Sequence, residues 1–99
     1  MNFEEKTYNA KVKYTWLGIE ENGAVVFTLG FDCKGGTYST LKLKLENNDI
    51  SYILQTLEVK NWEALPCKFA RVKVVDRTVV AIGNIINDVW FDFRNEVEH

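Results

Sequence analysis

The alternation of apolar and polar positions predicts two paired strands in the first third of the chain. In "KVKYTW" every second residue is apolar, so Val12, Tyr14 and Trp16 are expected on the buried face of a strand. The stretch "AVVFTLGF" has the same period of two and predicts a second strand. Between them, Asn22 and Gly23 suit the positive φ angles of a type I′ turn, so the two strands should form a hairpin.

A third strand is predicted over "TYSTLKLKL", where the same alternation continues. Leu41, Leu43 and Leu45 are expected to point inward in this strand. Lys42 and Lys44 are expected to point outward. Three strands therefore come before the first helix.

The pattern then changes to the period of a helix. Apolar residues recur at the i, i+3, i+4, i+7 spacing at Ile50, Ile53, Leu54 and Leu57. With Asn48 or Asp49 as its cap, this spacing predicts a helix over about residues 48–59. A further helical turn is predicted at "NWEAL", where Asn61 caps the turn, Trp62 anchors it and Pro66 ends it.

Strand patterns return in "FARVKVV", "VVAIGNII" and "VWFDF", which gives the order β-β-β-α-β-β with a sixth strand at the end. The predicted fold class is α+β and mostly β: a five- to six-stranded antiparallel sheet or partly open barrel with one helix. This is the element order of the OB-fold. Gly18 and Gly30 suit the sharp bends of barrel strands, although an open antiparallel sheet with a helix on one face fits the same pattern.

Length and composition point to one domain over residues 1–99, with flexible tails at 1–8 and 95–99. No apolar run approaches the length of a membrane span, and the first residues lack an apolar signal core. We therefore expect no membrane partner and a cytoplasmic location. Cys33 and Cys67 are too few for a disulfide framework and are interpreted as reduced structural thiols. His99 is either native or the start of a vector-encoded tag.

The paired glycines in "DCKGGTYST" suggest either a phosphate cradle or a tight turn. The stretch leads into a strand and lacks the spacing of a P-loop, so a tight turn at Lys34, Gly35 and Gly36 is the favoured interpretation. The alternative is a hairpin tip that contacts a ligand. In that case Lys34 would pair with an anion and Tyr38 would offer an aromatic face.

The chain offers little for catalysis. Its only histidine is the last residue, so a cysteine or serine nucleophile has no base nearby in the sequence. Asp88 and Asp92, with Glu63, are a weak candidate for a metal site because neither a histidine nor a DxDxDG loop accompanies them. We therefore expect no enzyme activity, no cofactor and no metal.

Tryptophans can stack on bases or fill a core. Trp16 is interpreted as core because it shares a strand face with apolar residues. Trp62 and Trp90 are candidate binding residues. In "VWFDF", Trp90 and Phe91 point to opposite faces, so one face should expose an aromatic ring or meet another surface.

The net charge of −2 conceals an uneven distribution of charge. Cations recur at i, i+2 in the strands, as Lys11 with Lys13, Lys42 with Lys44, and Arg71 with Lys73. These side chains either keep the sheet soluble and discourage edge pairing, which is the favoured explanation, or form a basic face for nucleic acid.

The segment "WEALPCKFARVKVV…VVAIGNIINDVWFDF" resembles a group of short phage and prophage proteins of uncharacterised function. The positions that carry the resemblance are Trp62, Glu63, Leu65, Lys68, Arg71, Val72, Ile82, Gly83, Trp90 and Phe91. This chain has Cys67 where the group has glycine, and its "KGGTY" is shorter than the group's glycine-rich loop. The resemblance implies a small accessory protein that acts on host proteins, host defence or nucleic-acid metabolism.

Together, these features predict a small non-enzymatic binding protein that occupies a macromolecule or sequesters a small ligand. A host or phage protein is the expected partner, and the sequence leaves the oligomeric state open. The alternative function is an OB-like module that binds single-stranded nucleic acid. The candidate binding residues are Lys34, Tyr38, Trp62, Arg71, Lys73 and Trp90.

Overall fold

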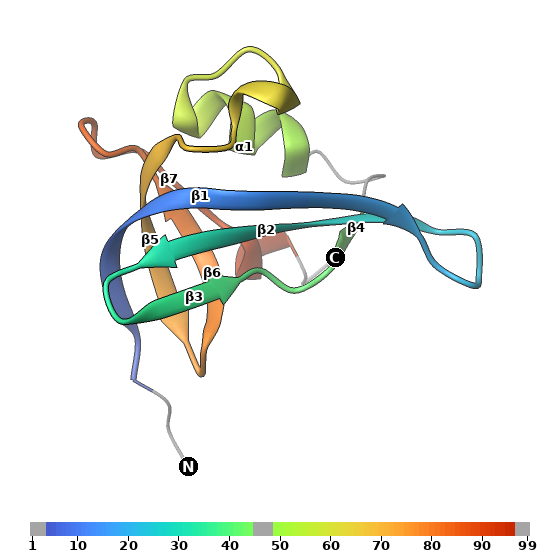
Figure 1. The fold of residues 1–99 in the computed structure, drawn as a ribbon, viewed down its shortest axis with the longest axis horizontal. Helices are drawn as coiled ribbons and strands as arrows, with labels where there is room; N and C mark the ends of the chain where they lie inside the picture. Colours follow the sequence, from blue (N-terminus) through green and yellow to red (C-terminus); the bar gives the residue numbers. More distant parts are fainter. Residues whose placement is uncertain (1–3, 45–48, 97–99) are drawn as a thin grey trace.

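The computed structural model describes residues 4–44 and 49–96, and the side chains of residues 95 and 96 are outside that description (Figure 1). The strands are β1 (Lys6–Ile19), β2 (Val25–Cys33), β3 (Gly36–Ser39), β4 (Leu43–Lys44), β5 (Phe69–Val75), β6 (Thr78–Gly83) and β7 (Trp90–Asp92). The helix α1 (Asp49–Leu57) and two short 3₁₀ helices, η1 (Trp62–Ala64) and η2 (Phe93–Glu96), complete the order.

Five strands close into a barrel in the order β1-β5-β6-β3-β2, because β2 also pairs with β1. β4 extends the sheet beside β2, and β7 pairs with β6. The helix lies between the third and fourth barrel strands in the sequence, so the predicted OB-like barrel is confirmed. The sheet is mixed rather than purely antiparallel, since β3 and β6 run parallel where the barrel closes.

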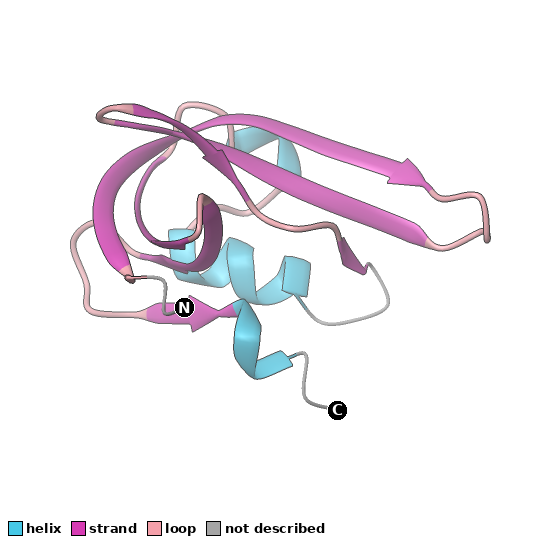
Figure 2. Cartoon of the chain, turned by 90° about the horizontal axis from the view of Figure 1, so that it is seen from below, coloured by secondary structure: helices cyan, strands magenta, loops and turns pink. Residues whose placement is uncertain are grey.

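The barrel interior is apolar and almost fully buried. On α1, Ile53 and Leu57 are completely buried, and Ile50 and Leu54 pack against the same core, as the helical spacing predicted. The predicted cap of η1 is confirmed, since the Asn61 side chain accepts a hydrogen bond from the Ala64 N–H. Figure 2 shows α1 and η2 on one side of the long β1–β2 hairpin, which continues past them.

The prediction that Tyr14 and Trp16 share the buried face with Val12 is wrong. β1 has a bulge between Val12 and Tyr14, and the extra residue reverses which side chains face inward. Val12 is buried, whereas Tyr14 and Trp16 point outward and Trp16 keeps 44% of its surface exposed. Beyond the bulge, Leu17 takes the face of the buried Phe27 opposite it, although Leu17 itself is exposed.

Gly18 and Gly30 have a different role from the predicted bends. The bend lies at the bulge, whereas each glycine makes room for an aromatic ring on the outer face. A Cβ atom on Gly30 would clash with the Tyr14 ring, and one on Gly18 would clash with the Trp16 ring. The two rings therefore fill the space that a side chain at Gly18 or Gly30 would need.

The predicted third strand is interrupted. β3 ends at Ser39 because the Thr40 hydroxyl, rather than a main-chain carbonyl, accepts the hydrogen bond from the Leu29 N–H. After this break, Leu41 is exposed rather than inward-facing, and Leu43 in β4 is partly buried. Leu45 lies outside the described residues.

The turns also differ in detail from the prediction. Of Asn22 and Gly23 only Gly23 has a positive φ, and hydrogen bonds Glu20 N to Ala24 O and Gly23 N to Glu20 O close a three-residue loop. A two-residue loop with positive φ at both positions occurs instead at Asp76 and Arg77.

The turn at "KGG" is confirmed, with Gly35 at φ 98° between the paired residues Cys33 and Gly36. It is a hairpin connection that leads into β3, as the favoured interpretation expected.

Residues 6–8, which were expected in a flexible tail over 1–8, belong to β1, where Lys6 pairs with Val74. Residues 1–3 and 97–99, His99 among them, lie outside the described residues, and Asn95 belongs to η2. Among the described residues, α1 and the two short 3₁₀ helices are all too short or too polar to cross a membrane.

Candidate binding surfaces

Three of the predicted binding residues lie together on the outer face of β5, β6 and β7. The strand register aligns Arg71 with Gly83 and Gly83 with Trp90. The Trp90 ring lies on Gly83, where an added Cβ would meet it at 2.7 Å. The Arg71 guanidinium carbon is 4.7 Å and the Lys73 Nζ is 4.5 Å from the centroid of the Trp90 ring. The aromatic ring is thus held between a glycine and two cations.

Arg71 also binds the segment that connects β6 to β7, residues 84–89, which we call the Asn84 loop. Its Nε donates to the Asn84 carbonyl at 2.8 Å, and its terminal NH2 group donates to the Asn87 carbonyl at 3.0 Å. Asp88 lies 3.5 Å from the same guanidinium and accepts a hydrogen bond from the Trp90 indole N–H at 3.1 Å. Arg71 therefore fixes both the loop and the ring.

Asn84 organises the loop from within. Its buried side chain accepts hydrogen bonds from the N–H groups of Ile86 and Asn87, both at 2.9 Å. Its amide group donates to the Thr56 carbonyl at the end of α1, at 2.9 Å. The main chain closes the loop with a hydrogen bond from Asn84 N to Val89 O. One side chain thus joins the loop to the helix.

Glu58 makes the second connection between the loop and α1. It follows the helix with φ at 57°, a conformation that costs a non-glycine residue about 1 kcal/mol or more. Hydrogen bonds from Val59 N to Leu54 O and from Glu58 N to Gln55 O end the helix around it. Its carboxylate accepts from the side-chain amides of Asn84 at 3.2 Å and Asn87 at 2.9 Å. A glycine at this position would lose those two bonds.

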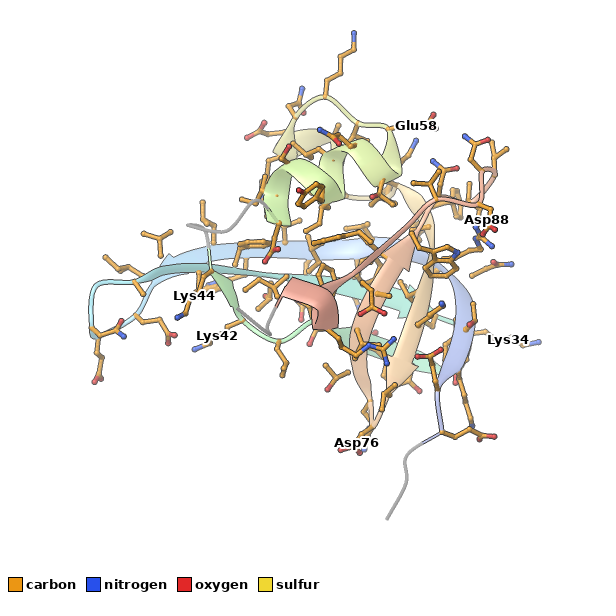
Figure 3. All side chains as sticks on the ribbon, turned by 180° about the vertical axis from the view of Figure 1, so that it is seen from behind. Lys34, Lys42, Lys44, Glu58, Asp76 and Asp88 are labelled. Carbon is orange, nitrogen blue, oxygen red and sulfur yellow. The ribbon has the colours of Figure 1, made fainter. Side chains whose placement is uncertain are left out.

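These hydrogen bonds hold the Asn84 loop in place, and the side chains at its tip are apolar. Ile86 is 86% exposed, and its neighbours Ile85 and Val89 are also exposed. Figure 3 places Asp88 and Glu58 toward one end of the molecule, and Lys42 and Lys44 toward the other. The exposed Ile86 side chain therefore projects from a loop whose polar groups already make hydrogen bonds.

Next to Trp90, Asp92 and Arg94 form a bidentate pair. The Asp92 carboxylate accepts from Arg94 Nε at 2.9 Å and from its terminal NH2 group at 2.6 Å, and Glu5 lies 2.9 Å from the same guanidinium. These hydrogen bonds lower the pKa of Asp92, although burial partly opposes the shift. The same bonds raise the pKa of Arg94, so that it stays charged.

The other predicted binding residues lie elsewhere. Lys34 points into solvent from the β2–β3 turn (Figure 3). Tyr38 packs against the core and stacks on Tyr8 with the ring centroids 5.9 Å apart. Trp62 meets the buried Phe27 edge to face at 5.6 Å. Tyr38 and Trp62 are therefore mainly packing residues.

The basic face predicted from the lysines forms in part. β1 and β5 pair, so Lys11 lies opposite Phe69 on the same outer face as Arg71. Lys11 and Phe69 also line an open depression of about 310 Å³, together with Asn9, Ala10, Asp32 and Cys33. Carboxylates accompany the cations here, since Asp88 pairs with Arg71 and Asp92 contributes to the field around Lys73.

The thiols show no arrangement for nucleophilic chemistry. Burial, followed by the charge of Asp32, raises the pKa of Cys33, which disfavours its thiolate. Cys67 is exposed rather than buried and has φ at 71°, in the region that favours glycine. Within residues 4–44 and 49–96, no three His, Cys, Asp or Glu side chains are grouped to hold a metal ion.

A second surface lies on the part of the β1–β2 hairpin beyond the bulge, residues 14–28, which we call the projecting hairpin (Figure 1). On its outer face Tyr14 and Trp16 are exposed, and the Lys42 Nζ lies 5.9 Å from the Trp16 ring centroid. On its other face Leu17 is 54% and Ile19 is 70% exposed. Apolar groups are thus exposed on both faces of this hairpin.

The sequence prediction missed Asn84, Glu58 and Ile86. Residues 84–86 were assigned to a strand because they extend an apolar run. The polar cluster "NDV" after "GNII" was the signal for a loop, since Gly and Asn commonly interrupt strands. The contacts of Asn84 with α1 join residues far apart in the sequence, and no local pattern predicts them.

Comparisons with models of protein families, with curated proteins and with solved structures find no match to this chain.

Proposed function

We propose that this protein is a non-enzymatic binding module whose partner is another protein, and that the Asn84 loop is its main contact. The observation that carries the proposal is Ile86, an 86% exposed isoleucine on a loop fixed by Arg71 and Asn84. Energetically dominant interface residues are anchors that enter a pocket of the partner. A loop that is already ordered loses little conformational entropy on binding.

The charges near the loop favour a protein over a nucleic acid. Arg71 uses its donors on two loop carbonyls and lies beside Asp88, so little of its charge is free for a phosphate. Arg94 is bound by Asp92 and Glu5. A surface of matched charges around an apolar anchor is typical of the rim and centre of a protein interface.

The resemblance to phage and prophage proteins extends this proposal to the class of partner. A protein of that origin would occupy a host or phage protein, and we propose that it does so in the cytoplasm. Fractionation of cells that express the tagged chain tests the location. Recovery outside the cytoplasmic fraction would contradict it.

The central test compares Ile86→Ser with Ile19→Ser, a matched change of an exposed isoleucine on the projecting hairpin. Immobilised wild type and both variants are incubated with a bacterial lysate, and the retained protein is identified and purified. Its affinity for each variant is then measured by calorimetry. We expect Ile86→Ser to weaken binding by about 30-fold or more, since anchor residues contribute about 2 kcal/mol or more.

Equal binding by wild type and Ile86→Ser would contradict the proposal. Loss of binding in Ile19→Ser alone would place the interface on the projecting hairpin. Circular dichroism of the variants controls for folding, because both positions are exposed and neither should alter the core.

Single-stranded nucleic acid is a second candidate ligand, favoured by Tyr14 and Trp16 on the outer face. OB-folds bind oligonucleotides on the face of their second and third strands and with the loop after the first strand, and Trp16 pairs with Thr28 of β2 beside this region. Exposed aromatic rings stack on bases. Lys42 lies over the Trp16 ring, although it also pairs with Glu20 at 3.2 Å. The proposed site is therefore small and only partly cationic.

Fluorescence anisotropy with a labelled oligonucleotide at low and high salt tests this candidate. Binding by this face should weaken with salt by a slope of about −0.7 per neutralised phosphate and should be lost in Trp16→Ala. Arg71→Glu with Lys73→Glu tests the basic face in the same assay. No binding at low salt would exclude both nucleic-acid surfaces.

A further inference from the structure

The outer edge of the projecting hairpin leaves main-chain groups without a partner strand. The Leu29 N–H and carbonyl both bind Thr40 rather than β1, and Glu20 N donates to Ala24 O. Hydrogen bonds in an antiparallel pair alternate, so the even residues of β1 bind β2 beyond the bulge. The odd residues Thr15, Leu17 and Ile19 therefore direct their N–H and C=O groups away from β2.

No described strand covers this edge. β5 pairs with β1 only as far as Lys11, and the main chain at Cys67 and Lys68 bonds to Val12. Within residues 4–44 and 49–96, the hydrogen bonds outside the ladders do not reach Thr15, Leu17 or Ile19.

The edge also lacks the protection that exposed strand edges usually have. Proteins guard such edges with prolines, inward charges or covering loops. Residues 14–19, "YTWLGI", contain no charge and no proline. The bulge lies before this stretch rather than within it. An uncharged edge with free main-chain groups is suited to the addition of another strand.

We propose that this edge pairs with the same edge of a second copy of this chain, in an antiparallel arrangement centred on Leu17. A two-fold axis at this residue lets Thr15 of each copy pair with the partner's Ile19, so the odd residues of both edges are all bonded. A shift of the axis to Thr15 or Ile19 leaves some of these groups unpaired.

The side chains in this register are complementary. Lys13, at the bulge, and Glu21, in the turn after β1, flank the paired segment, so a lysine of one copy and a glutamate of the other approach each other at both of its ends. Trp16 lies beside the partner's Gly18, which the partner's own Trp16 ring covers, so the two tryptophan rings come together on this face. Leu17 meets the partner's Leu17, and Ile19 lies beside them. Each copy therefore covers part of the apolar face that the other copy exposes.

Sedimentation velocity over about 1 to 100 µM protein tests the proposal. Wild type is expected to form dimers as its concentration rises. Leu17→Lys sets two like charges directly opposite each other on the axis and should weaken dimerisation by about tenfold or more. Ile86→Lys is the matched control, since it makes the same change at an exposed apolar residue of the Asn84 loop, and it should dimerise like wild type.

A charge-reversal cycle tests the register and does not depend on Leu17→Lys folding. Lys13→Glu and Glu21→Lys should each weaken the dimer by about 3- to 10-fold, because each exchange occurs twice in the symmetric complex. The double variant Lys13→Glu with Glu21→Lys should restore most of the lost affinity. Both positions are exposed, so neither change should affect folding.

A wild type that stays monomeric over the whole concentration range overturns the proposal, even if a strand of a different protein binds the edge. A dimer that survives Leu17→Lys, or that is lost in Ile86→Lys, overturns it as well, because the contact then lies elsewhere. Failure here is distinct from failure of the proposed function, which depends on Ile86 and is measured with a different protein.

Discussion

The Asn84 loop and the projecting hairpin both expose apolar side chains, but they differ in how their main chains are bonded. In the loop, Arg71 and Asn84 engage the main chain, so what remains available is the side chain of Ile86. In the hairpin, the edge of β1 that faces away from β2 at Leu17 and Ile19 has no neighbour among the described strands. The same apolar exposure therefore favours two kinds of recognition, by a side-chain anchor in one region and by the backbone in the other.

The two regions also share one local arrangement, a tryptophan ring packed over a glycine, but the two rings are held by different contacts. In each, a tryptophan ring lies over a glycine, Trp90 over Gly83 and Trp16 over Gly18. Trp90 is held by Arg71 and by a hydrogen bond to Asp88, whereas Trp16 is more exposed. The ring near the loop therefore has more contacts to hold it than the ring in the hairpin.

The largest expected effect is at the centre of the loop. Asn84→Ala removes the acceptor of two loop N–H groups and the donor to the Thr56 carbonyl, in a buried position. Unsatisfied buried groups cost about 1–3 kcal/mol, so we expect the free energy of unfolding in urea to fall by about 2–3 kcal/mol. The exposed Asn87→Ala is the control and should cost less. Equal losses would mean that Asn84 has no special role.

The next prediction contrasts the two glycines. Gly83→Ala places a methyl group against the fused part of the Trp90 ring, which cannot move without disturbing Arg71, and should destabilise the protein by about 1–3 kcal/mol. Gly18→Ala meets the far end of the exposed Trp16 ring, which can rotate away, and should cost less than about 1 kcal/mol. Thermal melts of both variants test the difference. Similar losses would contradict the contrast in rigidity.

A smaller effect separates Arg71 from Lys73, since both are cations next to the Trp90 ring. Arg71→Lys keeps the charge but loses the paired donors to the loop carbonyls, so the amides of residues 86 and 87 should exchange with deuterium about 5-fold faster, which corresponds to about 1 kcal/mol. Lys73→Gln should leave their exchange unchanged. Faster exchange in both variants would indicate that charge, rather than the donor geometry, holds the loop.

The smallest expected effect is the pH dependence that Asp92 contributes. Its pKa is lowered in the folded protein, so it binds protons more weakly there than in the unfolded chain and adds stability above its unfolded value near ~4. This contribution is lost as the pH falls through the folded pKa and should be below about 1 kcal/mol for so exposed a pair. In urea unfolding at neutral and acidic pH, the free energy of unfolding should fall less on acidification in Asp92→Asn than in wild type. If Asp92→Asn loses as much stability at acidic pH as wild type, other carboxylates cause that loss.

The sequence predicted the order of the elements because strand and helix periods are local properties. The helix with Ile53 and Leu57 inward, the turn at Gly35 and the cap at Asn61 all depend on residues close in the chain. The faces of β1 beyond Val12 were predicted wrongly, because a bulge is one extra residue that the period of two does not reveal. The alternation also did not reveal the early end of β3, because there the Thr40 hydroxyl replaces a main-chain acceptor.

For the candidate site, the sequence singled out Arg71, Lys73 and Trp90 by residue type, and the structure brings these three together. Tyr38 and Trp62 were selected by the same reasoning but pack against the core. An aromatic residue has the same local signature whether its ring covers a core or a surface. Burial separates the two cases, and burial depends on strands that are distant in sequence.

By itself, the sequence determined an OB-like order of strands and helix, because hydrophobic periods and turn residues act over a few positions. The tertiary structure alone decided that Asn84 and Glu58, which are 26 positions apart, together fix the loop. It also decided that the edge of β1 beyond the bulge has no neighbour among the described strands. Both depend on barrel closure, which sets the strands that meet and the edge that remains. Closure is a long-range choice of pairing partners, and the alternation within a single strand carries no information about it.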